Sequence, residues 1–321
     1  MNALSILVTG GAGFIGSNLS RKLIEAGHSV CAVDNLITGH RPNVETLLLS
    51  ERFTFVEADV ASADFPKLMS GKKFDHIYHL ACPTGVPNLV TLAEEMLRTC
   101  SYGTFNVLEL SKELHARTIV ASTAEIYGDP EVTPQHENYT GNVNPIGPRS
   151  AYEEGKRFAE AVTAMYVRKH KVHASVVRIF NTYGPGMSLD DARVIPQFIR
   201  SIKEGRPLTI YGDGSQTRTH QYIDDLLNGL EIAMEKGASG EAYNVGGDAP
   251  TSIKELATLL LEMSGSTVGI EFKPHFIEDH GSRLPATEKM KSLGWTKSVS
   301  MKDGLARMIA HYLNRPTANV L

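Results

Sequence analysis

Two residues four positions apart, Tyr152 and Lys156 in the stretch SAYEEGKR, have side chains that could perform acid–base chemistry. Four residues make about one turn of an α-helix, so both side chains would lie on one helix face. A neighbouring ammonium lowers the pKa of a phenol, and a phenolate can remove a proton from an alcohol. Because YxxxK is also common on ordinary helices, a catalytic role needs support from other groups.

Further polar side chains follow the predicted strand at 117–123, within VASTAEIYGDP. Ser122 and Thr123 stand at the C-terminal end of that strand, where α/β sheets bind ligands. Glu125 follows Thr123 by two residues, so on an extended segment both would face the same side. This set suits removal of an alcohol proton during hydride transfer to a nicotinamide, with the tyrosine pKa falling from about 10 towards neutrality.

The glycine-rich stretch VTGGAGFIGSNL follows the first predicted strand and opens the first predicted helix. Glycines there let the backbone approach a pyrophosphate, and the helix N-terminus offers free N–H groups. Asp34 ends the next strand, where a carboxylate favours NAD over NADP, although the nearby Arg41 could oppose that preference. Asp59, at the end of the third strand, is expected to contact adenine. The expected NAD-binding residues are Gly10, Gly13, Phe14, Ile15, Gly16, Asp34, Asn35, Asp59, Val60, Leu80, Tyr152 and Lys156.

Strands that alternate with helices must position these residues. Apolar runs predict strands at 4–8, 29–34, 53–59, 74–81, 117–123 and 173–181. Helical periodicity predicts helices at 104–114, 151–170, 194–205 and 252–265. The pattern predicts an α/β fold, a Rossmann-type doubly wound parallel sheet over residues 1–184, with 222–248 returning to it. Residues 185–321 are expected to form a smaller α/β substrate-binding lobe.

Composition restricts the partners and the cellular compartment that we expect. The net charge of −4 gives no electrostatic case for nucleic acid. No apolar stretch approaches the roughly 20 residues of a membrane helix, and the N-terminus does not read as a signal peptide. The three cysteines have no metal-ligand spacing, so no metal is expected, and their sparse, odd number favours a reducing compartment. We therefore expect a cytoplasmic protein.

Longer motifs carry a family resemblance. TGGAGFIG, HLA, STAEIYGD and YEEGK resemble the extended short-chain dehydrogenase/reductase superfamily, the NAD-dependent epimerases and dehydratases of nucleotide sugars. ASTAEIYGDPEVTPQHENYTGNVNPIGPRSAYEEGKR, RIFNTYGPGM and PLTIYGDGSQTRTHQYIDDLLNGL are most similar to UDP-glucuronate decarboxylases, the UDP-xylose synthases. The resemblance implies that Tyr152 and Lys156 are the catalytic base pair, assisted by Thr123 and Glu125. It also implies a homodimer in which the helices bearing Tyr152 and residues 103–114 pack against their partners.

The resemblance implies a reaction on a UDP-sugar. NAD would oxidise carbon 4 of the glucuronate, the resulting β-keto acid would lose carbon dioxide, and the cofactor would return its hydride. Dehydratases of the superfamily carry an Asp-Glu pair after the threonine, whereas Ala124 stands here, which counts against dehydration. Arg283 is expected near the reacting carboxylate. The remaining expected substrate-binding residues are Pro83, Ser122, Asn181, Arg193, Tyr211 and Arg218.

The chain departs from the family pattern at Leu89, at Leu92-Ala93, at Cys100 and at Ala286. The altered 84–93 loop favours an alternative, a UDP-sugar 4-epimerase that uses the same Tyr152, Lys156 and Thr123. A second alternative is a catalytically silent NAD-sensing protein, although such proteins typically lose the tyrosine or the lysine. Cys82 is expected to pack near the nicotinamide without acting as a nucleophile.

Overall fold

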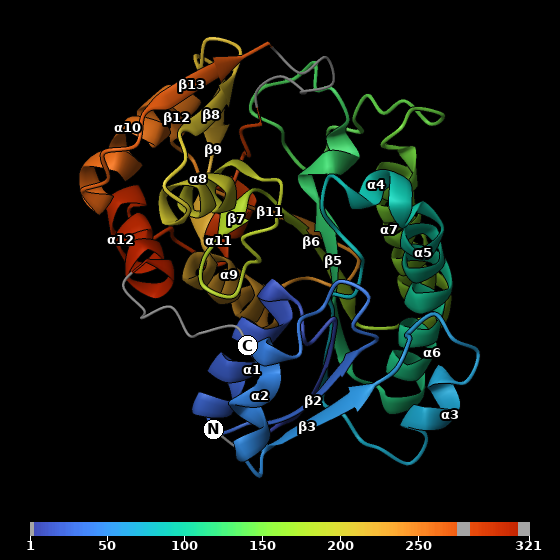
Figure 1. The fold of residues 1–321 in the computed structure, drawn as a ribbon. Coiled ribbons are helices and arrows are strands. Elements are labelled where there is room, and N and C mark those ends of the chain that lie inside the picture. The colour runs from blue at the N-terminus through green and yellow to red at the C-terminus, as the bar shows by residue number, and fades with distance from the viewer. Residues whose placement is uncertain (1–2, 275–282, 314–321) are drawn as a thin grey trace.

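A computed structural model describes residues 3–274 and 283–313, and its core is a seven-stranded sheet (Figure 1). The strand order is β11-β6-β5-β4-β1-β2-β3, and every neighbouring pair is parallel. Both faces are covered by helices, which confirms the doubly wound α/β fold. The strands are β1 (Ser5–Thr9), β2 (Ser29–Asp34), β3 (Phe53–Glu57), β4 (His76–His79), β5 (Arg117–Thr123), β6 (Ala174–Ile179) and β11 (Ala242–Val245).

The helices cover the sheet through their apolar faces. Helices α3 (Phe65–Met69), α6 (Thr104–Leu114) and α7 (Ser150–His170) lie on one face, with α4 (Asn88–Thr91) and α5 (Ala93–Arg98) at the C-terminal strand ends (Figure 1). Helices α1 (Phe14–Glu25) and α9 (Ile223–Lys236) lie on the other face, and α2 (Pro42–Glu45) follows β2. A π-helical turn, η2 (Thr99–Gly103), joins α5 to α6, so one continuous helical rod passes beside the site.

A smaller group of elements packs at one end of the sheet. It contains three strand pairs: β7 (Thr182–Tyr183) with β10 (Gln221–Tyr222), β8 (Leu208–Tyr211) with β13 (Ile270–Lys273), and β9 (Thr217–Thr219) with β12 (Pro250–Ser252). Its helices are α8 (Val194–Lys203), α10 (Ile253–Ser264), α11 (Glu288–Ser292) and α12 (Met301–Tyr312). The division at residue 184 stays a prediction, and residues 275–282 and 314–321 of the expected lobe lie outside the described residues.

One buried carboxylate ties the C-terminal segment to α9. Asp225 is fully buried, and its oxygens accept hydrogen bonds from Ser298 N at 2.8 Å, Ser298 Oγ at 2.7 Å and Val299 N at 3.2 Å. Its backbone carbonyl also accepts a bond from Trp295 Nε1 at 2.8 Å. A buried charge needs such partners, so these bonds fix the chain that follows α11 against the sheet domain.

The sequence predicted the long elements better than the short ones. The strands end earlier than expected, because residues 58–59, 80–81 and 180–181 have left the sheet and enter the loops of the site. Strands β7, β9, β10, β12 and β13 were not expected, since segments of two to four residues show no periodicity. Within the described ranges, no helix is both long and apolar enough to cross a membrane.

Candidate active site

The turn between β1 and α1 is packed too tightly for side chains. Gly10 has φ +72°, and a Cβ there would lie 2.9 Å from the Ala81 backbone. A Cβ on Gly16 would lie 2.1 Å from the Gly10 carbonyl oxygen. Gly13 precedes α1 with no side-chain cap, so the first N–H groups of the helix remain open to a ligand. The turn therefore has the backbone of a phosphate-binding loop.

Asp34 fixes this loop from the end of β2. Its Oδ2 accepts a hydrogen bond from Ala12 N at 3.0 Å, and its Oδ1 accepts one from Leu36 N at 2.8 Å. Burial raises the pKa of the Asp34 carboxyl, and these N–H groups oppose that rise. Arg41 is held away, because its Nη1 donates to Glu57 Oε2 at 3.0 Å. The expected conflict between Arg41 and Asp34 is therefore not seen.

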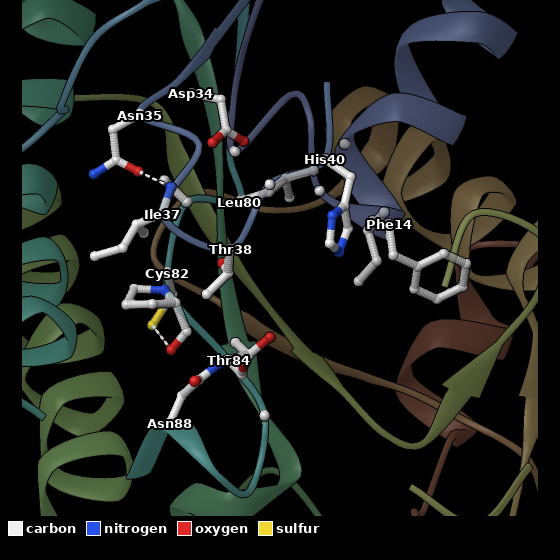
Figure 2. A pocket seen from close by; sticks show the side chains of 18 of the residues that line it. Phe14, Asp34, Asn35, Ile37, Thr38, His40, Leu80, Cys82, Thr84 and Asn88 are labelled. Carbon is white, nitrogen blue, oxygen red and sulfur yellow. Dashed lines mark hydrogen bonds between the residues drawn. The ribbon is translucent and has the colours of Figure 1, made fainter. Parts of the chain in front are cut away.

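A cavity of about 480 Å³ opens beside the loop (Figure 2). Figure 2 shows Asp34 and Asn35 at the end of β2, Phe14 at the start of α1, and Leu80 and Cys82 after β4. The cavity is lined by every residue expected to bind the cofactor through the glycine loop and the strand ends, namely Gly10, Gly13, Phe14, Ile15, Gly16, Asp34, Asn35, Asp59, Val60 and Leu80. We call it the cofactor cavity.

The tyrosine, the lysine and the threonine come together at the start of α7. The side chain of Thr123 is hydrogen-bonded to Tyr152, and Lys156 Nζ donates to the Ala121 carbonyl oxygen at 2.8 Å. Burial raises the pKa of Tyr152 to about 12, and the positive charge of Lys156 opposes this. The expectation of a near-neutral tyrosine is therefore wrong for the chain's own groups, because desolvation of the phenolate outweighs one ammonium.

Lys156 is positively charged near pH 7. Burial lowers its pKa, but the thiols of Cys82 and Cys100 and the Tyr152 phenol act in the opposite direction, and the net pKa is raised. His79 lies nearby between the hydroxyls of Thr9 and Thr104, with Nδ1 2.8 Å from Thr9 Oγ1. Burial lowers the His79 pKa to about 3, so this neutral histidine is a structural residue of the strand end.

Glu125 lies between two arginines. It belongs to a 3₁₀ turn, η3 (Ala124–Tyr127), capped by the Thr123 hydroxyl, and not to the extended segment that we expected. Its Oε2 accepts hydrogen bonds from Arg283 Nη2 at 3.0 Å and from Arg149 Nη2. Arg283 Nη1 also donates to the Gly128 carbonyl at 2.7 Å, so the guanidinium holds both the carboxylate and the turn. The Glu125 side chain is therefore held in place by two guanidinium groups.

Sequence reasoning missed Arg149, which bridges Glu125 and Glu153. Its Nε donates to Glu153 Oε1 at 3.1 Å, four residues along the helix. Burial lowers the pKa of Arg149, but the two carboxylates raise it by more. The i, i+4 spacing with Glu153 was a visible signal, whereas the contact with Glu125 depends on the tertiary fold.

A second cavity of about 590 Å³, the nucleotide cavity, lies between α8, β8, β9 and the start of α7. Four expected substrate residues line it: Asn181, Arg193, Tyr211 and Arg218. Arg193 also lines the cofactor cavity, as do Met187 and Ala192, so the two cavities meet at this segment. The Arg193 guanidinium is paired with Asp191, its Nε 2.9 Å from Oδ1. Two arginines beside an aromatic ring suit a nucleoside diphosphate.

Sequence reasoning also missed His220 in the nucleotide cavity. Burial lowers its pKa to about 4, and Arg218 and Arg193 lower it further, so the ring is neutral near pH 7. The residue is 7% exposed. No spacing marked His220, because only the fold brings it into one cavity with Arg193.

Comparison with known proteins identifies the family of this chain. The NAD dependent epimerase/dehydratase family matches residues 6–246. The chain belongs to this family. It is 43% identical to UDP-glucuronic acid decarboxylase 1 of Arabidopsis thaliana over 97% of this chain and 70% of the relative.

Solved structures of two relatives share the fold of this family member. UDP-glucose 4-epimerase from Thermotoga maritima with UDP-glucose superposes with a TM-score of 0.89, at 30% identity, over 97% of this chain and 99% of that one. UDP-glucuronic acid 4-epimerase from Bacillus cereus, in complex with UDP-glucuronic acid and NAD, gives a TM-score of 0.86 at 28% identity, again over 97% and 99%.

Two expected substrate residues of this epimerase/dehydratase family member lie elsewhere. Ser122 Oγ donates to Glu160 Oε1 at 2.5 Å, and the same carboxylate binds the Arg178 guanidinium. Ser122 therefore belongs to a structural network between β5 and α7, and we do not retain it as a substrate residue. Pro83 lines the cofactor cavity and does not line the nucleotide cavity.

Proposed function

We propose that this protein is an NAD-dependent UDP-glucuronate decarboxylase that produces UDP-xylose. The observation that carries the proposal is the position of Glu125, which is held by Arg149 and Arg283 and lies two residues after Thr123, the hydrogen-bond partner of Tyr152. A simple dehydrogenase does not need a fixed acid beside its tyrosine. A reaction at the carbon next to the oxidised one needs such a group to orient the sugar or deliver a proton. Curated decarboxylases that are 39 to 43% identical over nearly the whole chain support it.

The residues present fit NAD. A Cβ at Gly10 or Gly16 would meet backbone atoms, so the tight turn requires glycine at both positions. Such a turn lets the backbone approach a pyrophosphate closely. The Asp34 carboxylate is positioned to accept hydrogen bonds from ribose hydroxyls and to repel a 2′-phosphate. When bound, NAD would accept a hydride from carbon 4 of the sugar and later return it.

The chain's own groups move the protons. Tyr152 takes the proton of the sugar 4-hydroxyl, and its hydrogen bond with Thr123 orients the phenol towards that oxygen. Lys156 stabilises the phenolate, and a positive nicotinamide nearby would add to this effect. A further positive charge is needed, because Lys156 alone does not bring the tyrosine near neutrality.

Glu125 serves the carbon that loses carbon dioxide. Once carbon 4 is a ketone, the uronate is a β-keto acid, and the ketone accepts the electron pair released with carbon dioxide. Carbon 5 must then take up a proton in place of the lost carboxyl group. The fixed Glu125 carboxylate orients the ring or the water that delivers this proton, and Arg283 lies beside it to receive the substrate carboxylate.

The UDP group is assigned to the nucleotide cavity. Arg193 and Arg218 are proposed to bind the diphosphate with Asn181, and Tyr211, which is 42% exposed, to pack on the uracil or ribose. The neutral His220, which lines the same cavity, adds a further hydrogen-bonding group.

A UDP-sugar 4-epimerase is the second candidate. Val86, Leu89 and Val90 line the nucleotide cavity, so the altered loop presents apolar side chains to the substrate side. The two epimerase structures above share the fold over the full chain. A silent NAD-sensing protein is a weaker candidate, because Tyr152, Lys156 and Thr123 are assembled as a working site would require.

Product analysis separates these candidates. Purified protein is incubated with UDP-glucuronate and NAD, and nucleotide products are separated and weighed by mass spectrometry. A UDP-pentose with equimolar carbon dioxide supports decarboxylation. A UDP-hexuronate of unchanged mass but different retention supports the epimerase, and the absence of any turnover of UDP-glucuronate contradicts the proposal.

We also propose that the protein is a cytoplasmic homodimer. Leu97 of α5, Tyr102 of η2 and Phe158 of α7 are 46%, 59% and 46% exposed on the helices expected to pair. The sparse cysteines support a reducing compartment. Light scattering after gel filtration should give twice the chain mass, and a monomer at micromolar concentration would contradict the dimer.

A further inference from the structure

Two cysteines from separate segments meet beside the catalytic helix. Cys82 follows β4, and Cys100 lies in the π-helical turn η2. Their sulfur atoms are 3.7 Å apart, and either can donate a hydrogen bond to the other. This distance exceeds the roughly 2.05 Å of a disulfide, so the pair is a dithiol that needs an approach of about 1.7 Å to become linked.

Helix α7 fixes one member of the pair. Cys100 is 2% exposed and packs on Gly155, where an added Cβ would lie 3.3 Å from Cys100 Cβ and 3.4 Å from its sulfur. Gly155 stands between Tyr152 and Lys156 in the sequence, so Cys100 contacts the helix at the catalytic turn. Any movement that links the sulfurs must therefore come mainly from Cys82.

Cys82 is the member that can move and be reached. It is partly exposed, lies outside any regular element, and lines the cofactor cavity, as Figure 2 shows. Its sulfur lies 3.9 Å from the Pro83 carbonyl oxygen. The neighbouring Pro83 and Thr84 line the same cavity, so displacement of this loop changes the cofactor's surroundings.

The surroundings favour a thiolate. The hydrogen bond from Cys82 lowers the pKa of the Cys100 thiol to about 7, burial raises it, and the Lys156 charge lowers it again. The pKa of the Cys82 thiol is raised correspondingly, because one proton is shared between the two sulfurs. The anion therefore lies mainly on Cys100, and transfer of the Cys82 proton to Cys100 across the 3.7 Å contact gives the minor form, the thiolate of the partly exposed Cys82.

We propose that Cys82 and Cys100 form a reversible dithiol–disulfide site between the cofactor cavity and helix α7, with hydrogen peroxide as its oxidant. The Cys82 thiolate attacks a peroxide oxygen, so an S–O bond forms, the O–O bond breaks, and the leaving hydroxide takes the Cys100 proton to become water. Cys100 then attacks the Cys82 sulfur, the S–S bond forms and a second water leaves. Two thiols are oxidised, and the peroxide is reduced to two waters.

The linked form should bind NAD more weakly, because the Cys82 loop is drawn away from the cavity towards η2. We expect the NAD dissociation constant to rise about fivefold or more, in the usual range for coupled sites. A thiol reductant should restore it. The site does not depend on the proposed reaction, since thiol linkage and NAD affinity can be measured without substrate.

The test maps disulfides by mass spectrometry after graded peroxide exposure of the full-length protein, and measures NAD affinity by calorimetry before and after reduction. Cys31, buried on strand β2 in a different part of the core, provides the matched control. Cys31→Ser should keep both the Cys82–Cys100 peptide and the affinity change, whereas Cys100→Ser should lose both.

Three results would overturn the proposal. The first is oxidation of Cys82 to sulfinic acid without the linked peptide. The second is an affinity change that persists in Cys100→Ser. The third is a linked protein with unchanged NAD affinity.

Discussion

Replacing Lys156 by methionine tests the acid–base account of the site. The change removes a buried charge one helical turn from Tyr152 and the 2.8 Å bond to the Ala121 carbonyl, while it keeps a chain of similar length. Two unit charges about 5 Å apart interact by about 3 kcal/mol at an effective dielectric constant near 20. At about 1.4 kcal/mol per factor of ten, the phenolate population falls by about 100-fold or more.

The assay is the initial rate of turnover against pH with NAD at saturation. Burial already raises the pKa of Tyr152 to about 12, and loss of Lys156 removes the group that opposes it. Deprotonation then needs a higher pH. We therefore expect a rate loss of about 100-fold at every pH below the wild-type pKa of Tyr152 in the NAD complex, and a smaller loss above that pKa.

Lys156→Arg is the matched control, because it keeps the positive charge while it changes the shape of the group. It should retain much more activity near neutral pH than Lys156→Met. Equal losses in Lys156→Met and Lys156→Arg would refute the electrostatic role. NAD affinity measured separately shows whether either variant acts through cofactor binding.

Three further variants test other parts of the structure. Gly16→Ala places a Cβ 2.1 Å from a carbonyl oxygen and should weaken NAD binding at least tenfold in calorimetry, whereas Gly269→Ala, with no atom within 4 Å, should not. Arg283→Met should lower kcat about 100-fold with little change in NAD affinity, because it releases the carboxylate and the η3 turn. Asp225→Asn should cost about 2 kcal/mol of unfolding free energy in urea, while the exposed Asp224→Asn should cost about 0.5 kcal/mol or less.

The cofactor half of the site could be predicted because its signals are local. The spaced glycines lie in one strand–turn–helix unit, and Asp34 ends the next strand. The glycines and Asp34 all line the cofactor cavity. Tyr152 and Lys156 are likewise four apart on one helix. Hydrophobic runs fix such strands and helices, and the parallel sheet then brings their C-terminal ends together.

The substrate half could be predicted only in part. Ser122 and Thr123 are neighbours on β5, so their side chains point to opposite faces, and only one can reach the tyrosine. This alternation could have excluded Ser122, whose partner is Glu160. The contacts of Arg149 with Glu125, and of Cys82 with Cys100, join separate elements, so no sequence spacing reveals them.

The pKa of Tyr152 shows where residue chemistry is not enough. The presence of a nearby lysine predicted a lowered value, but the sign depends on how deeply the phenol is buried. Burial is a property of the assembled loops around α7, and the sequence does not give it.

The most direct measurement is proton NMR of the reaction in D₂O with UDP-glucuronate and NAD. Loss of carbon dioxide leaves carbon 5 with a pair of electrons that must take up a proton from solvent. We therefore expect a UDP-pentose that carries one deuterium at carbon 5 beside the retained H5, so the H5 signal of the hexuronate is replaced by that of a single pentose C5 proton. A hexuronate inverted at carbon 4, with H5 retained and no pentose signal, would contradict decarboxylation.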